Sequence, residues 1–284
     1  MKKFLLISLF AILVSFSSAQ EKMPESRWAS MDKTRIHYYD IGSQKNKNAI
    51  VFIHGWTCSA DFWRGSYNEF PQNRVIAIDL VGHGQSDRPN AIYSMDLFAK
   101  SVDAVLTKAK VDKAVLVGHS MGTPVARQFY RLFPQKVAGV VIVDGALRPF
   151  ASSEIFEQYF APVRSNYAKN APGFMDGMLN DIKDVELRTW IRERMLATRA
   201  PVALSAMDAM LDPSIWGSDK INVPVLAVMA ESQSWKPDEE EFFRSVAPNL
   251  EFRMWKSISH FLMMEKPAEF NNEIKAFVAK NKLL

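Results

Sequence analysis

Val115-Leu116-Val117-Gly118-His119-Ser120-Met121-Gly122 is the stretch on which the fold depends. An apolar run ends in Gly-x-Ser-x-Gly, and residues 123–133 then have the spacing of a helix closed by Pro134. A strand that turns sharply into a helix is the context of a nucleophile elbow, in which the serine hydroxyl projects from a strained turn. Glycines flank the serine because strand and helix nearly touch there. The stretch therefore predicts an α/β fold with Ser120 as its nucleophile, and an ordinary strand-to-helix loop is the alternative.

The chain has 284 residues, 48% of them hydrophobic, which suffices for one large core or a core with an insertion. Its first 19 residues have the pattern of a secretory signal peptide: two lysines, an apolar run over 4–16, and Ser17-Ser18-Ala19 before the cut. The run is too short for a convincing membrane span. We expect cleavage after Ala19, a secreted or periplasmic protein, and no stable membrane insertion; an uncleaved anchor is the alternative.

Charge and cysteine content exclude several classes of protein. Residues 1–19 hold two lysines and no acid, so their removal from 35 basic and 31 acidic residues leaves a net charge of +2. Such a balance, with no basic block, gives no case for a nucleic-acid partner. Cys58 is the only cysteine, so no internal disulfide can form.

Apolar runs separated by helical patterns predict a parallel sheet covered on both faces. A hairpin is expected within 25–41. Buried strands are expected at 49–53, 74–78, 113–117, 137–143, 224–229 and 250–255, and helices at 93–110, 239–246 and 267–280.

Residues 146–219 break this pattern, because they contain no good strand. Helical pieces are expected at 154–168, 185–197 and 202–211, with a break at Pro172-Gly173. We therefore predict a core made of residues 20–145 and 220–284, with residues 146–219 inserted as a helical cap.

A serine needs a base that takes its proton and donors that stabilise the oxyanion. His260 is the only histidine after Ser120, and it follows the last predicted strand. The backbone N–H of Met121 is one expected oxyanion donor. The N–H of Trp56 is the other, because His54-Gly55-Trp56 follows an early buried strand.

Taken together, the motifs resemble the α/β-hydrolase superfamily, in its cap-bearing branch of esterases and lactonases. The matching segments are His54-Gly55-Trp56, residues 79–86, residues 118–122, and His260 followed by Glu265-Lys266-Pro267. The resemblance implies a mostly parallel eight-stranded sheet with helices on both faces and a helical cap after the sixth strand. It also implies structural roles for His83 and His119.

The acid of the triad departs from the family pattern. The usual carboxylate follows the seventh strand, where this chain has Ala230-Glu231-Ser232-Gln233, and Gln233 cannot carry the charge that stabilises an imidazolium. Asp144, at the end of the sixth strand, is the preferred acid, because a short carboxylate at a strand end is easily preorganised. Glu231 is the alternative.

The cap composition indicates an apolar substrate cleft. Expected substrate-binding residues are Trp56, Phe150, Phe156, Tyr159 and Phe160. We expect an exported serine hydrolase that cleaves small-molecule carboxylic esters or lactones, macrocyclic lactones included, through an acyl-enzyme on Ser120 and without metal or organic cofactor. The alternatives are a non-catalytic ligand-binding protein and a peptidase or amidase of the same fold.

Overall fold

The computed structural model describes residues 23–149 and 151–284. The expected signal peptide, residues 1–19, and the expected substrate-binding residue Phe150 lie outside the described residues.

An eight-stranded sheet forms the centre of the molecule, in the order β1-β2-β4-β3-β5-β6-β7-β8. β1 pairs antiparallel with β2, and β2 antiparallel with β4, whereas the other pairs are parallel. The predicted mostly parallel α/β sheet is confirmed. The strand bounds are β1 Ser26–Met31, β2 Thr34–Ile41, β3 Asn48–Ile53, β4 Arg74–Ile78, β5 Lys113–His119, β6 Val137–Val143, β7 Val225–Ala230 and β8 Leu250–Trp255.

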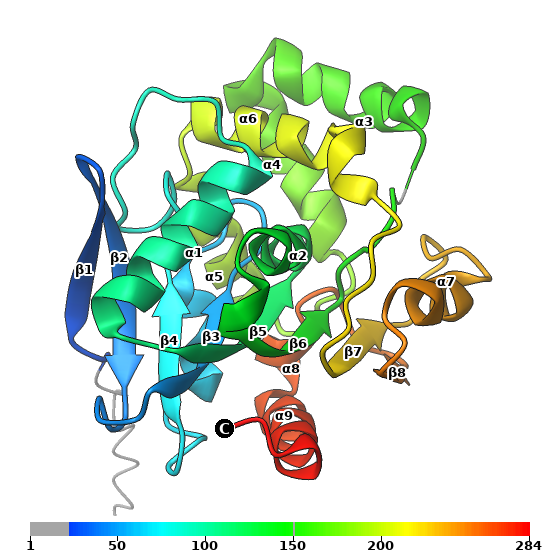
Figure 1. Ribbon diagram of the computed structural model, residues 1–284. Helices are drawn as coiled ribbons and strands as arrows, with labels where there is room; N and C mark the ends of the chain where they lie inside the picture. Colours follow the sequence, from blue (N-terminus) through cyan, green and yellow to red (C-terminus); the bar gives the residue numbers. More distant parts are fainter. Residues whose placement is uncertain (1–22, 150) are drawn as a thin grey trace, which may run out of the picture.

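Helices cover both faces of this sheet, which explains why its central strands are apolar along their whole length. α1 and α2 pack together on one face (Figure 1). On the other face, Trp63 lies between Phe52 of β3 and Phe270 of α9. The helix bounds outside the β6–β7 connection are η1 Ala60–Ser66, α1 Met95–Ala109, α2 Gly122–Leu132, η2 Pro134–Lys136, α7 Glu239–Val246, α8 Leu262–Glu265 and α9 Pro267–Asn281.

The connection from β6 to β7 is helical and lies beyond the carboxyl ends of the parallel strands (Figure 1). Its helices are α3 Ser153–Ser165, α4 Tyr167–Leu179, α5 Val185–Leu196, α6 Ala200–Leu211 and η3 Pro213–Trp216. The predicted break at Pro172-Gly173 is wrong, because both residues lie inside α4. Burial of Ala171, Met175 and Leu179 along one face of α4 offsets the hydrogen bond that the proline removes.

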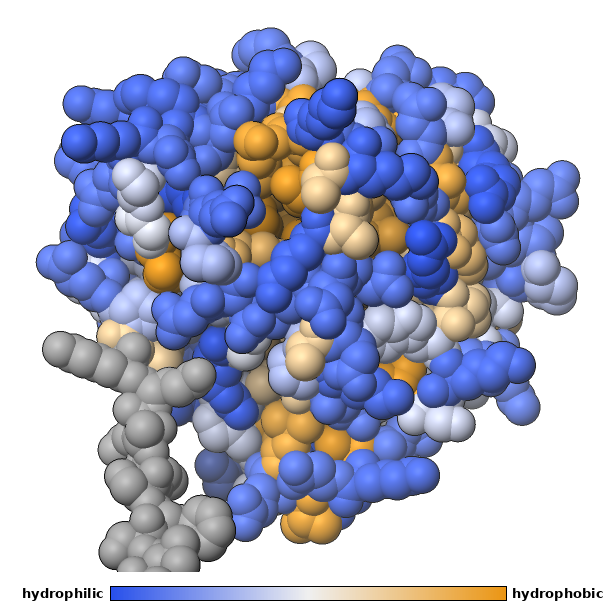
Figure 2. All heavy atoms as spheres, turned by 90° about the horizontal axis from the view of Figure 1, so that it is seen from below, coloured by the Kyte–Doolittle hydropathy of each residue, from blue (hydrophilic) through white to orange (hydrophobic). Residues whose placement is uncertain are grey.

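The opposite side of the molecule, at the amino ends of the parallel strands, is mainly hydrophilic, with hydrophobic side chains showing in separate areas (Figure 2). Among the described residues, no helix combines the length and the apolar character that crossing a membrane requires.

Candidate active site

Ser120 occupies a strained turn between β5 and α2. Its φ is 52°, a left-handed conformation that costs free energy for a residue with a side chain. The flanking glycines make the turn sterically feasible. A Cβ on Gly118 would lie 2.4 Å from the carbonyl oxygen of Gly122, and a Cβ on Gly122 would lie 2.3 Å from that of Ile53. This geometry is that of a nucleophile elbow.

Asp144 and His260 meet beside this turn although 116 residues separate them in the sequence. The His260 Nδ1–Asp144 Oδ2 distance is 2.6 Å, and Asp144 is only 5% exposed. The other carboxylate oxygen, Oδ1, accepts a hydrogen bond of 2.8 Å from the Ala230 N–H. The carboxylate is therefore fixed at both oxygens, one on the histidine ring and one on the end of β7.

Asp144 also has a left-handed backbone, with φ 42°, and the next residue must be glycine. A Cβ on Gly145 would lie 2.0 Å from Thr123 Oγ1. The close approach of this turn to the start of α2 is what brings the Asp144 carboxylate near the elbow.

Glu231, the alternative acid, takes another direction. Its side chain is 56% exposed, and its Oε1 lies 3.8 Å from Lys256 Nζ. The two candidate acids therefore differ in geometry: Asp144 contacts the His260 ring, whereas Glu231 faces solvent beside a lysine.

Two side chains hold the backbone of the His260 loop. Glu265 Oε1 accepts from the Ser259 N–H at 2.9 Å, and His119 Nε2 lies 2.8 Å from the His260 carbonyl oxygen. Burial, together with the nearby His260 ring, lowers the pKa of His119 well below its usual value, so its ring is neutral and Nε2 carries the donated proton. The sequence marked Glu265 and His119 as motif residues but did not indicate that both support His260.

The two expected oxyanion donors lie on the elbow and on the loop after β3, and both Trp56 and Met121 line the same cavity as Ser120. Gly55 allows the loop to approach, because a Cβ at this position would lie 3.1 Å from the Ser120 Cβ. The Trp56 indole donates to the Ala203 carbonyl of α6 at 2.8 Å, so it forms part of the wall and ties the loop to the cap helices.

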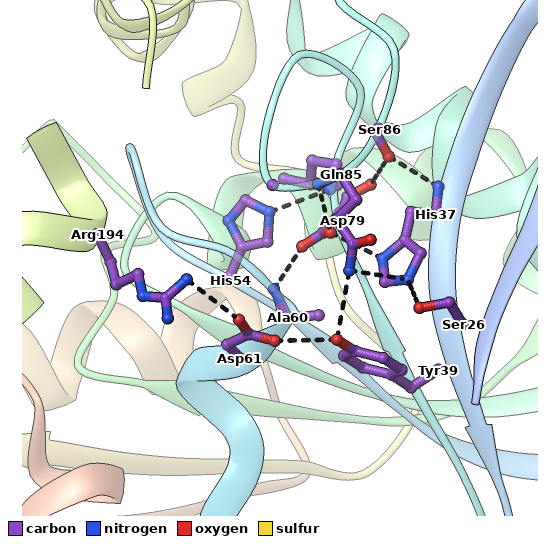
Figure 3. Close-up of polar contacts among 12 residues, drawn as sticks. Ser26, His37, Tyr39, His54, Ala60, Asp61, Asp79, Gln85, Ser86 and Arg194 are labelled. Atoms are coloured by element: carbon purple, nitrogen blue, oxygen red, sulfur yellow. Dashed lines mark hydrogen bonds and ion pairs between the residues drawn. The ribbon is translucent and has the colours of Figure 1, made fainter. Parts of the chain in front are cut away.

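A buried network around Asp79 supports this loop from the sheet side (Figure 3). The Asp79 carboxylate accepts hydrogen bonds from the Ala60 N–H (2.7 Å), the Gln85 N–H (2.8 Å) and His37 Nδ1 (2.8 Å). Burial by itself would raise the pKa of Asp79, but the His37 hydrogen bond and the nearby imidazoles outweigh it and hold this pKa below its usual value. Asp79 is thus an ionised anchor for the start of η1.

His54 fixes the other end of the loop (Figure 3). Its Nε2 accepts from the Leu80 N–H at 3.0 Å and its Nδ1 donates to the Gly55 carbonyl at 2.8 Å, which requires a neutral ring. Burial lowers the pKa of His54, and burial together with the His54 ring lowers the pKa of His83 to about 3. Both histidines are structural parts of the loop support.

Ser120, Asp144 and His260 open onto a cavity of about 410 Å³, a volume typical of small-molecule sites. Its wall is mostly apolar. The lining residues from the cap and the strand ends include Phe156, Phe174, Met178, Asp181, Met207, Met210, Trp216, Glu231, Ser232, Ser234 and Trp235.

The expected substrate-binding residues are only partly on this wall. Trp56 and Phe156 line the cavity. The prediction that Tyr159 binds substrate is wrong, because this residue is 70% exposed on the outside of α3. The prediction that Phe160 binds substrate is also wrong. This residue is fully buried behind the wall, with its ring centroid 5.5 Å from that of Phe174. Composition identified the cap as apolar, but which helix face points inward depends on how the helices pack.

Among residues 23–149 and 151–284, no group of three or more His, Cys, Asp or Glu side chains is arranged to hold a metal ion.

Comparison with known proteins identifies the family to which this fold and its nucleophile elbow belong. The model of a family described as alpha/beta hydrolase fold matches residues 48–197, and the chain belongs to this family. A non-heme chloroperoxidase of Streptomyces lividans is 29% identical over 273 residues, which are 87% of this chain and 97% of that protein.

Solved structures give the same picture. Est816, described as an N-acyl homoserine lactone degrading enzyme, is 28% identical with a TM-score of 0.75, covering 89% of this chain and 100% of that one. A thermophilic esterase is 26% identical with a TM-score of 0.74, covering 91% and 99%. These neighbours, an esterase and a lactone-degrading enzyme, support hydrolase activity on a small molecule.

Proposed function

We propose that this protein is a serine hydrolase of carboxylic esters or lactones that works through an acyl-enzyme on Ser120. The observation that carries the proposal is the 2.6 Å contact between His260 Nδ1 and Asp144, beside a serine on a left-handed turn. A non-catalytic binding protein would have no need of this arrangement.

In the proposed reaction, Ser120 Oγ attacks the ester carbonyl while His260 takes its proton at Nε2. Asp144 holds the ring by Nδ1 and stabilises the imidazolium. The N–H groups of Trp56 and Met121 donate to the oxyanion. His260 then gives this proton to the leaving alcohol. Water, deprotonated by His260, attacks the acyl carbonyl, and His260 returns the proton to Ser120 Oγ as the acid leaves. A lactone follows the same steps, with the alcohol and the acid remaining in one product.

The cavity supports a largely apolar substrate that carries no negative charge. Apart from Asp144, its lining includes two carboxylates, Asp181 and Glu231, and among the described lining residues there is no lysine or arginine; Lys256, outside the lining, offsets part of the charge of Glu231. Neutral or cationic esters therefore fit this site better than anionic ones. Macrocyclic lactones remain within the proposed class.

A fluorophosphonate probe, which reacts with activated serines, tests the proposal. We expect stoichiometric labelling of the purified protein, no labelling of Ser120→Ala, and hydrolysis of a p-nitrophenyl ester that disappears with the same substitution. Equal labelling of wild type and Ser120→Ala, or no labelling of either, would leave a binding protein as the better description.

We also propose that the protein is exported after cleavage behind Ala19, on the pattern of residues 1–19. Mass spectrometry of the protein isolated from its native cells should give an amino terminus at Gln20. An intact Met1 would contradict export by this route.

A further inference from the structure

The loop that carries Trp56 is under backbone strain at the next residue. Thr57 has φ 57°, and a β-branched residue rarely adopts this left-handed conformation. Such a conformation persists only where the surrounding contacts over-determine it. The contacts around Thr57 are therefore the ones that set the direction of the Trp56–Thr57 backbone.

Several of these contacts come from the loop itself. The Trp56 carbonyl accepts from Thr57 Oγ1 at 2.7 Å and from Cys58 Sγ at 3.3 Å. The Gly55 carbonyl accepts from the Cys58 N–H at 3.2 Å. These bonds shape the turn, but they move with it, so they do not fix its position relative to Ser120.

The contacts that fix the position of the turn relative to Ser120 come from the cap. Thr198, between α5 and α6, donates its hydroxyl to the Thr57 carbonyl at 3.0 Å in a buried contact. Five residues later, the Ala203 carbonyl accepts from the Trp56 indole at 2.8 Å. One short segment of the cap thus holds the strained turn at two successive residues, while Asp79 and His54 hold its two ends from the sheet (Figure 3).

We propose that Thr198 is a positioning residue for the reaction, which acts by holding the Thr57 carbonyl so that the Trp56 N–H points at the oxyanion. This inference rests on the proposed function of Ser120 and assigns the cap a second role beside forming the cavity wall. Thr198 is 7% exposed and does not line the cavity, so it has no contact with substrate of its own. Its effect should therefore appear in the transition state and not in ground-state binding.

The substitution Thr198→Val removes the donor and keeps the shape of the side chain. We expect kcat on a neutral p-nitrophenyl ester to fall about tenfold to a hundredfold with KM unchanged, because about 1 Å of misplacement of a catalytic group has an effect of this size. Affinity for a boronic acid, which forms a tetrahedral adduct with the serine, should fall by the same factor as kcat/KM. Thr198→Ser, which restores the hydroxyl, should recover most of the rate.

Two further variants separate positioning from stability. Thr189→Val is the matched control, because the Thr189 hydroxyl donates at 2.8 Å to Val185 within α5, and its kcat should equal that of wild type. Thr198→Ala removes the donor without placing a methyl group against the carbonyl, and serves if the valine variant unfolds. The melting temperature of each variant is measured beside its kinetics.

The results distinguish this inference from the proposed function. If Ser120→Ala abolishes hydrolysis while folded Thr198→Val and Thr198→Ala keep the wild-type kcat and boronic acid affinity, the role of Thr198 is refuted and the serine mechanism stands. An increase in KM with unchanged kcat would also refute it, since it would indicate substrate binding. If the wild type neither hydrolyses esters nor labels, the proposed function itself fails.

Discussion

At the scale of single residues, Asp144 is the position at which the structure adds most to what the sequence indicates. Both candidate acids end neighbouring strands, so the sequence left two alternatives. The structure gives one of them, Asp144, hydrogen bonds at both carboxylate oxygens and leaves the other, Glu231, beside Lys256. Only the first arrangement can orient an imidazole.

The two acids can be separated by isosteric substitution. Asp144→Asn should lower kcat on the order of 10⁴-fold, because an amide neither stabilises the imidazolium nor selects the productive tautomer. Glu231→Gln should leave kcat on a neutral ester close to wild type, because this side chain does not contact His260. Steady-state kinetics on one p-nitrophenyl ester compares the two variants. A large loss of kcat in Glu231→Gln with little loss in Asp144→Asn would assign the acid to Glu231.

At the scale of elements, the elbow is built from the close contact of β5, α2 and the end of β3. Gly122, the first residue of α2, lies against the backbone of β3, where the added Cβ would meet the Ile53 carbonyl at 2.3 Å. Backbone cannot move aside as a flexible side chain can. The position therefore requires glycine for packing, independently of any chemistry at Ser120.

Gly122→Ala should therefore lower the free energy of unfolding by about 1–3 kcal/mol and reduce kcat, since strand and helix must separate to admit the methyl group. Gly173→Ala, inside α4, is the control. Apart from the backbone of its own helix and its chain neighbours, no atom lies within 4 Å of its added Cβ, so this variant should gain about 0.5–1 kcal/mol from lower chain entropy. Urea unfolding measures both, and equal stabilities would show that the elbow tolerates a side chain.

The elements differ in how well the sequence predicted them. The central strands β3 to β7 lie where continuous apolar runs placed them, because burial on both faces leaves a strong local pattern. The cap was recognised as helical, yet Pro172 lies inside α4, and Tyr159 points outward. In the cap, α4 packs against both α3 and α5, so the inward face of each helix depends on packing that no local period encodes.

At the scale of the whole molecule, the charge around the cavity should select substrates. Asp181, which lies between α4 and α5 of the cap, and Glu231, which follows β7 of the core, both line it. For two esters of equal length, one with a terminal ammonium and one with a carboxylate, we expect kcat/KM to favour the ammonium about fivefold or more.

The double substitution Asp181→Asn with Glu231→Gln should remove most of this preference, and added salt should weaken it in the wild type. Glu240→Gln, which neutralises an exposed acid paired with Arg244 on α7, is the control and should leave the ratio unchanged. A wild-type ratio near one would contradict an electrostatic role for the cavity rim.

The buried histidines make the free energy of unfolding of the whole fold depend on pH. His54, His83 and His119 have pKa values below the usual 6.5 in the folded state, that of His83 at about 3. Below pH 6.5 the unfolded chain binds protons that the folded protein resists, so stability must fall as the pH falls from about 6.5 towards 3.

His83, whose pKa falls to about 3, should contribute a slope that approaches about 1.4 kcal/mol per pH unit between about pH 6 and pH 4, and the lowered pKa values of His54 and His119 act in the same direction. Urea unfolding at pH 7.5, 6 and 5 measures the total, and His83→Gln should make the slope shallower by that amount. If the free energy of unfolding changes with pH by the same amount in wild type and His83→Gln, His83 binds its proton as readily in the folded protein as in the unfolded chain, and this prediction is wrong.

The sequence by itself determined the order of the strands and of the core helices along the chain, and it indicated the elbow at Ser120 and His260 as the proposed base, because these depend on local period and on order along the chain. Only the tertiary structure decided which carboxylate contacts His260, which cap side chains face the cavity, and that Thr198 holds Thr57. These contacts join residues 116 and 141 positions apart. They depend on the directions of individual side chains after packing, and a one-dimensional pattern does not carry those directions.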